Sequence, residues 1–312
     1  MLSRVANALF WMARYLERGE HVARLVGVTS AYSQELRGAA PEAAATGWDA
    51  LLKLLGSEPV AGEAGYQTVH RLLFDREEAN SIINCVELAR ENARGIRDAL
   101  SSEMWETLNV LHLRVQEAAP SAPSEAADLS MLQAVRNGAH LFQGLRDNTL
   151  RQGDEWRFLC LGQFMERADA TTRTLEAMYL HPALELAEAH GYYIDNLHLG
   201  MTLRCVTAYE AFNRSGHTLS PERVASFMLL ENDFPRSVES CLARVGDSLH
   251  ELSGTPASLF SNPAEQLCGR VVARLRFASI QEILEGGFKS YLQQLLDEIQ
   301  QIGSSIGAEY FR

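Results

Sequence analysis

The stretch "YLERGEHVAR", residues 15–24, decides how this chain folds, because the same pattern recurs as "FMERADATTR" at residues 164–173. In each copy an acid follows three residues after the Glu of a Glu-Arg pair, and an Arg follows four residues after that acid. The two copies supply Glu17, Arg18, Glu20 and Arg24, and then Glu166, Arg167, Asp169 and Arg173. A charged pattern repeated among apolar residues indicates two related helices.

A helical wheel shows where the charges of the first copy lie. At about 100° per residue, the apolar residues around Leu16 form one arc. Glu20 falls inside this arc, and Glu17 and Arg24 fall at its edge. Arg18 falls on the side away from the core. The second copy gives the same arrangement, so we expect both helices to place an acid on the core side, with an Arg four residues later beside it.

The structural interpretation of this pattern is a pair of linked helices. A partly buried acid–Arg pair neutralises its own charges, and the fork of donors on Arg can tie two helices together. The motif helices would then be neighbours across a pseudo-twofold axis, with each salt bridge reaching the other copy. On this interpretation Arg18 and Arg167 lie on the outer face, where they could contact a partner.

Two functional alternatives stay open for the same residues. Arg24, Arg173 and their neighbours could recognise a carboxylate, a phosphate or a peptide. Inward-facing carboxylates on bundle helices can also hold metal ions, but di-iron bundles use Glu-x-x-His, which neither copy contains. Arginines flank every carboxylate and oppose a divalent cation. We therefore predict no metal site and no cofactor.

Composition excludes several classes of protein. The 312 residues are 46% hydrophobic and 22% charged, which is typical of a soluble globular protein with a sizeable core. The net charge of −12 argues against a nucleic-acid binder, because phosphate contacts need clustered Lys and Arg. The sequence contains no run of 18 consecutive apolar residues, so no membrane-spanning helix is expected. The N-terminus does not resemble a signal peptide. The five cysteines form no CxxC pair, which favours a reducing cytoplasm over a disulfide framework.

Apolar residues recur at spacings of three and four, which predicts an all-α multi-helix bundle. The chain is expected to be a single helical domain, with possible halves 1–118 and 129–312 joined by a Pro/Ser/Ala linker at 119–128. The predicted helices cover about 3–36, 47–55, 66–73, 81–119 (bent near Ser101), 129–150, 154–180, 263–285 and 288–302, with a further start at Ser220-Pro221.

A second charged cluster lies between the two motif copies. It consists of Asp75, Arg76, Arg90, Glu91, Arg94 and the aromatic Trp105. Charges at helical spacings of three and four usually form a solvated face laced with salt bridges. The alternative is a binding surface, since a large aromatic near a helix start can anchor a partner.

Four segments carry a resemblance to a known family: residues 1–24, 72–109, 153–176 and "FPRSVESCL" at 234–242. In this order they resemble the bacterial alpha-E domain family, all-helical domains named for their Glu-Arg motifs. The resemblance covers nearly the whole chain. It implies a setting beside circularly permuted ATP-grasp proteins, enzymes that join a carboxylate to an amine, in a peptide-forming or peptide-tagging pathway.

Two functions follow from these observations. The first is a non-catalytic helical partner or adaptor of an ATP-grasp ligase, which binds the ligase, its peptide substrate, or both. The absence of the phosphate-binding patterns GxxxxGK and GxGxxG favours it. The second is an enzyme that uses paired carboxylates and arginines in a bundle cavity for acid–base work. Open carboxylates in a pocket would favour the enzyme, and carboxylates closed off by Arg would favour the structural interpretation.

Overall fold

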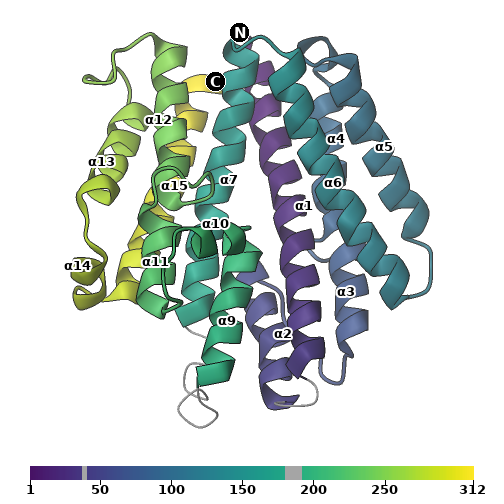
Figure 1. Ribbon diagram of the computed structural model, residues 1–312. Coiled ribbons are helices and arrows are strands. Elements are labelled where there is room, and N and C mark those ends of the chain that lie inside the picture. The colour runs from purple at the N-terminus through teal and green to yellow at the C-terminus, as the bar shows by residue number, and fades with distance from the viewer. Residues whose placement is uncertain (37–40, 180–191) are drawn as a thin grey trace.

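The computed structural model describes residues 1–36, 41–179 and 192–312, and within these ranges the chain forms helices and no strand. The predicted all-α multi-helix bundle is therefore confirmed. Figure 1 shows the helices running mostly up and down, with the N- and C-termini at the same end of the bundle.

Two helices carry the motif copies and lie side by side in the middle of the bundle (Figure 1). They are α1 (Ser3–Leu36), which matches its predicted range, and α7 (Asp154–Tyr179). A Cβ added at Gly162 on α7 would lie 2.2 Å from the carbonyl oxygen of Phe10 on α1. Only glycine, which lacks that carbon, lets the two backbones come so near. The two motif helices are thus packed together, as the sequence predicts.

Five helices that follow α1 in sequence cover one side of it. They are α2 (Pro41–Leu55), α3 (Gly65–Phe74), α4 (Ile82–Arg94), α5 (Ser102–Ala118) and α6 (Glu125–Thr149). α2, α4 and α6 pack directly on α1, while α5 packs against α4 and α6. In Figure 1 these helices form the right-hand and lower parts of the bundle.

The prediction of a single long helix over residues 81–119 is wrong. α4 and α5 are separate helices, joined through a 3₁₀ turn at Arg97–Ala99. The Ser101 side chain caps α5 by accepting a hydrogen bond from the backbone N–H of Met104 at 3.3 Å. Such a cap satisfies one of the donors left free at a new helix start. The chain therefore reverses here, and α4 and α5 pack against each other.

The predicted linker is shorter than expected. α5 ends at Ala118 and α6 begins at Glu125, which leaves residues 119–124 between them. Glu125 and Asp128 both stand in the first turn of α6, where acids stabilise a helix through its dipole. These acids explain why part of the expected linker is helical.

The remaining helices lie on the other side of α1 and around α7 (Figure 1). They are α9 (Tyr192–Cys205), α10 (Tyr209–Arg214), α11 (Pro221–Leu230), α12 (Val238–Ser253), α13 (Pro263–Phe277), α14 (Ile280–Glu285) and α15 (Phe288–Tyr310). α12 and α15 pack on α7, and α13 packs on both of them. α7 is consequently covered on several sides.

Cap chemistry explains the starts of two of these helices. Ser220 accepts a hydrogen bond from the backbone N–H of Arg223 at 3.3 Å, which confirms the predicted start of α11. The helix predicted over 263–285 is instead broken. There Ser279 begins α14 with a capping box, in which Ser279 and Glu282 bond each other's backbone N–H groups.

Buried apolar side chains of both groups of helices form one connected core cluster around α1 and α7. Phe10, Leu9 and Met12 of α1 are among the largest side chains that are fully buried. Among the described residues, no helix has the length and apolarity needed to cross a membrane.

Candidate functional site

The two Glu-Arg motifs bond each other across the contact between α1 and α7. Arg18 donates to Glu166 twice, from Nε to Oε1 at 2.6 Å and from Nη2 to Oε2 at 3.1 Å. Arg167 donates in return from Nε to Oε1 of Glu17 at 2.7 Å. Each motif therefore supplies the carboxylate for one ion pair and the guanidinium for the other.

Glu17 is surrounded by four donor side chains, which come from α6, α7 and the segment before α12. Its side chain lies in the core, with 1% of the residue exposed. Besides Arg167, Arg236 lies 3.1 Å from Oε1, and the amides of Gln143 and Gln163 donate to Oε2 at 2.8 and 3.3 Å. A buried carboxylate needs such partners, because an unpaired one would be costly. Both oxygens of Glu17 are thus already engaged.

Glu20 is fully buried and is held in a similar way. Arg24 donates to Oε1, and Arg236 donates to Oε2 at 3.0 Å. His140 Nε2 lies 3.6 Å from Oε1. The predicted pair of Glu20 with Arg24 is therefore present in the core. Arg236, which stands just before α12, bridges Glu20 and Glu17 and so links a third segment to the motif helices.

Glu166 is closed off by two arginines of α1. Arg14 donates from Nε to Oε2 at 2.7 Å, and Arg18 occupies both oxygens as described above. The guanidinium of Arg14 also lies over the Trp11 ring, 5.1 Å from its centroid. We call the ion pairs of Glu17, Glu20 and Glu166 with their arginines the motif network. It contains three carboxylates and five guanidinium groups, a formal surplus of two positive charges.

The charges of the motif network keep its glutamates ionised. Burial alone would raise the pKa of Glu17, but Arg167 and Arg236 hold that pKa below its ordinary value. The pKa of Glu20 is well below its ordinary value for the same reason, with Arg236 the strongest opposing charge. Arg14 and Arg18 likewise lower the pKa of Glu166 against its burial.

His21 lies beside this network and behaves differently. Burial lowers the pKa of His21 to about 4, with a smaller opposing effect of Glu20. Both of its ring nitrogens are buried and have no hydrogen-bond partner among the residues that the structure describes. His21 is therefore neutral at pH 7.

Two sequence predictions about the second copy and the outer arginines are wrong. Asp169 and Arg173 do pair, at 2.8 Å, but the pair lies at the surface, with 49% of the Arg173 side chain exposed. Arg167, predicted to face outward, is buried, and Arg18 is 29% exposed at its side chain and fully paired. The wheel assumed one apolar arc, whereas α7 is covered by α1, α12 and α15 on several sides.

The second charged cluster does not join the motif network. Arg76 pairs with Glu87 at 2.6 Å, and Glu91 pairs with Arg90 at 2.6 Å and Arg94 at 2.8 Å. These side chains are partly or fully exposed, as expected for a solvent-facing helix surface that carries ion pairs.

The aromatic and acidic members of that cluster have local roles. Trp105 is half-buried against the core, and Arg97 lies over its ring, 3.9 Å from the centroid. Asp75 accepts a hydrogen bond from the backbone N–H of Glu77 at 2.9 Å. Both contacts stabilise local structure at the ends of α3 and α5.

Sequence reasoning missed four members of the site: Arg14, Arg236, Gln143 and Gln163. Arg14 could have been found, because it precedes Arg18 by four residues and so lies on the same face of α1. Arg236 is the single cation of "FPRSVESCL", a segment already singled out. Nothing in the sequence marks the two glutamines.

The carboxylates of the motif network are already paired with arginines. All four motif acids, Asp169 included, are bound by Arg within 3.1 Å. Among the described residues, no group of three or more His, Cys, Asp or Glu side chains could hold a metal ion. The geometry is that of a structural ion-pair network.

Fold and site together define an all-helical protein in which reciprocal Glu-Arg pairs join two central helices. The chain belongs to the Alpha-E family, described as a predicted alpha-helical domain with a conserved ER motif, whose model matches residues 1–311. The two reciprocal pairs give a physical meaning to the ER motif of that description.

Curated relatives are known in mycobacteria. The chain is 26% identical over 318 aligned residues to an uncharacterized protein of Mycobacterium bovis and to uncharacterized proteins of two strains of Mycobacterium tuberculosis. Each match covers 94% of this chain but 35% of the relative, so the chain spans about a third of the length of these relatives. No solved structure matches the chain significantly.

Proposed function

We propose that the chain is a non-catalytic helical module that acts beside an ATP-grasp-type carboxylate–amine ligase in a peptide-forming or peptide-tagging pathway of the cytoplasm. In this role the bundle binds the ligase, its peptide substrate, or both, and it supplies no reacting group itself.

The observation that carries this proposal is the closure of the motif carboxylates. A general acid or base must reach the substrate and exchange its proton near the working pH. Glu17, Glu20 and Glu166 are buried, paired with Arg and held at low pKa. They therefore fit a structural role better than a role in acid–base catalysis.

Two further facts support a module that works with other protein. The mycobacterial relatives continue well beyond the region that matches this chain, so related domains occur within longer proteins. The family resemblance implies ATP-grasp proteins as neighbours.

The test is direct binding between purified proteins. The chain and a candidate ATP-grasp protein from the same organism, taken as the cognate protein, are mixed at micromolar concentration and followed by calorimetry, with an ATP-grasp enzyme of another pathway as the control. The proposal expects a complex with the cognate protein alone. Binding to neither protein, or equal binding to both, contradicts it. Turnover by the chain alone that Glu17→Gln abolishes would establish the enzyme alternative instead.

A further inference from the structure

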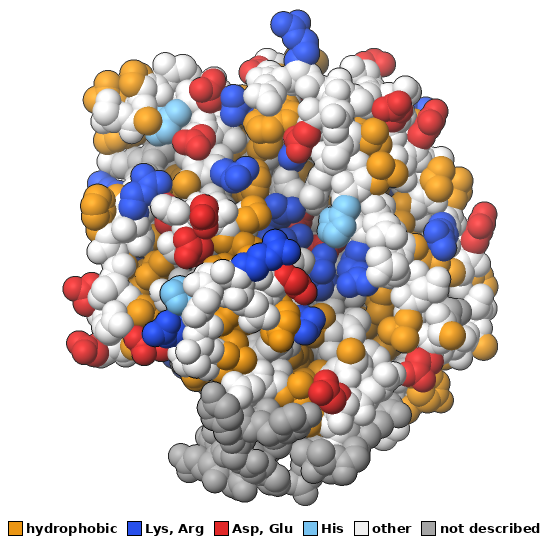
Figure 2. Space-filling view, viewed as in Figure 1, with side chains coloured by type: hydrophobic (Ala, Val, Ile, Leu, Met, Phe, Trp, Pro, Cys, Tyr) orange, Lys and Arg blue, Asp and Glu red, His pale blue; other side chains and the backbone are white. Residues whose placement is uncertain are grey.

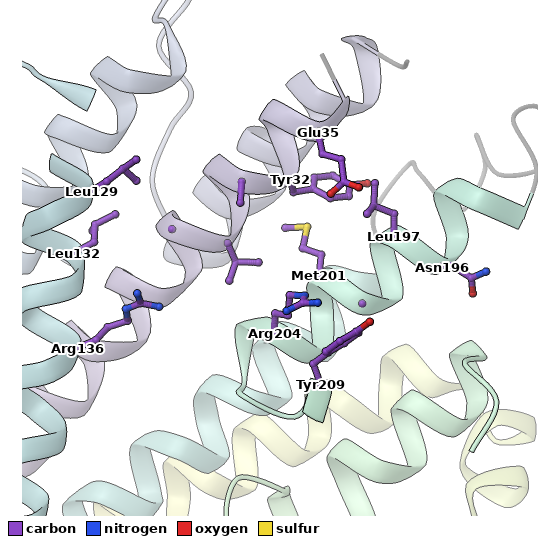
Figure 3. Close-up of a pocket in the computed structure, with 14 residues that line it drawn as sticks. Tyr32, Glu35, Leu129, Leu132, Arg136, Asn196, Leu197, Met201, Arg204 and Tyr209 are labelled. Atoms are coloured by element: carbon purple, nitrogen blue, oxygen red, sulfur yellow. The ribbon is translucent and has the colours of Figure 1, made fainter. Parts of the chain in front are cut away.

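A pocket of about 670 Å³ opens between α1, α6 and α9, next to the motif network. Figure 3 shows Leu129, Leu132 and Arg136 entering it from α6, and Met201 and Arg204 from α9. The motif network contributes no side chain to its lining. The pocket is therefore a separate feature of the fold.

The register of α1 against α6 shows which residues share a level. Near one end Gln34 donates to Glu125 at 2.7 Å, and further along Gln143 donates to Glu17 at 2.8 Å. The two helices are thus antiparallel, and the residues of α1 near position 25 face the residues of α6 near position 135. On α9, the ring centroid of His198 lies 6.4 Å from that of Tyr32. Burial raises the pKa of the Cys205 thiol and the charge of Arg24 opposes this rise, so the later residues of α9 reach the level of Arg24.

Two arginines of the lining make one end of the pocket cationic, with Arg136 entering from α6 and Arg204 from α9 (Figure 3). Arg24 of α1 is not part of the lining, but it lies close enough to Arg136 for its charge to act on that side chain. Within the described part of the chain, the Nε atoms of Arg136 and Arg24 are both buried without a hydrogen-bond partner. Burial lowers the pKa of Arg136, and the charge of Arg24 lowers it further. An anion at this end would relieve both effects.

Arg204 is held in place by an aromatic ring. Its guanidinium carbon lies 3.8 Å from the centroid of the Tyr209 ring, and both residues line the pocket. The turn between α9 and α10 brings the ring there, with Thr207 at a φ of +59°, a conformation that a β-branched residue rarely adopts. Stacking covers the face of the guanidinium and leaves its N–H edge to donate.

Neither arginine of the pocket lining forms an ion pair with a carboxylate of the described ranges. Among the described residues, no carboxylate lies within salt-bridge distance of Arg136 or Arg204, although Gln133 accepts one hydrogen bond from Arg136. Figure 2 shows Lys and Arg side chains gathered with a histidine around a hollow in the centre of this face. The surplus positive charge of the motif network lies next to them.

The rest of the pocket is apolar. Leu132 and Met201 lie in its middle, and Glu35 lies towards the end opposite the arginines (Figure 3). A site with one cationic end and an apolar body matches a molecule with an anionic head and a short apolar tail. The acid at the far end disfavours a second negative charge on the tail.

We propose that this pocket binds a small amphiphilic anion, with its carboxylate or phosphate head between Arg136 and Arg204 and its apolar tail along Leu132 and Met201. This inference goes beyond the proposed partner role and stands on the pocket alone. Guanidinium groups suit either head, because their paired N–H donors match the oxygens of carboxylate and phosphate.

The experiment uses Met201 as a reporter inside the pocket. The chain is labelled with ¹³C at its methionine methyl groups, and Met201→Leu assigns the signal. Hexanoate, hexyl phosphate and hexanamide are titrated separately. We expect the Met201 signal to shift with hexanoate, with hexyl phosphate or with both, and the stronger binder identifies the head group. Hexanamide, which lacks the charge, should bind at least tenfold more weakly.

Variants locate the head of the ligand. Arg136→Met and Arg204→Met keep the length of the side chain and remove its charge, and each should weaken binding about tenfold or more. Arg114→Met is the matched control, because Arg114 is exposed on α5 and is not part of the pocket. The proposal is overturned if the Met201 signal stays unchanged with both anions, if hexanamide binds equally well, or if the pocket variants bind like the Arg114 control.

Discussion

Replacing Arg167 with Met should destabilise the fold strongly, because it leaves a buried carboxylate short of a partner. Arg167 is 9% exposed, and its Nε atom lies 2.7 Å from Oε1 of Glu17, which is itself 1% exposed. Removing one member of a buried pair costs about 3–5 kcal/mol. Glu17 keeps Arg236 at 3.1 Å, so we expect a loss near the lower limit, about 3 kcal/mol.

The matched control is Arg173→Met, which removes the same kind of side chain one and a half turns further along α7. Arg173 is half-exposed, and its pair with Asp169 spans four residues of one helix. Such a pair contributes about 0.2–0.5 kcal/mol. The structure thus reverses the expectation from sequence alone, in which Arg173 was a buried partner and Arg167 an exposed one.

Urea unfolding followed by circular dichroism measures both variants. We expect the unfolding midpoint of Arg167→Met to fall clearly below that of the wild type, while Arg173→Met stays close to it, with the slope unchanged in both. The reasoning is refuted if the two variants unfold together, or if Arg173→Met is the less stable of the two.

Three further predictions concern stability and reactivity. Because the pKa of His21 is about 4 in the fold and about 6.5 when unfolded, the unfolded state binds the extra proton first. Stability should therefore fall as the pH drops from about 6.5 to 4, by about 3 kcal/mol, and His21→Gln should lose less over this range in pH-dependent unfolding. Gly162→Ala should cost at least about 1–3 kcal/mol in thermal melts by forcing α1 and α7 apart, whereas Gly144→Ala, with open space at its Cβ, should be neutral or stabilising. All five cysteines are buried, and burial raises the pKa of each thiol, so a thiol reagent such as Ellman's should react with them only after unfolding; rapid labelling of the native chain would contradict this.

The sequence predicted those parts of the fold that depend on helical periodicity and on the spacing of residues within one helix. The range of α1 and the pair of Glu20 with Arg24 follow from helical periodicity and from the spacing of four residues. The packing of the two motif helices follows from the need to pair acids on an apolar face. Each of these features follows from the pattern within a single helix or from the repetition of that pattern in a second helix.

The rest of the site depends on which distant segments meet. Arg236 contacts Glu17 and Glu20 although it lies more than 200 positions further along the sequence, and no spacing rule connects these residues. Arg167 is buried because α7 is covered on several sides, which a wheel with one apolar arc cannot represent. The α1–α6–α9 pocket likewise exists only through the register of three separate helices.

The central claim is that the two Glu-Arg motifs join α1 to α7 through reciprocal buried ion pairs. A double-mutant cycle between Glu17→Gln and Arg167→Met tests it most directly, because it measures the coupling of residues that stand 150 positions apart. We predict that the double variant is more stable than the sum of the single losses implies, with a coupling energy of about 1–3 kcal/mol. A coupling energy indistinguishable from zero would contradict the claim.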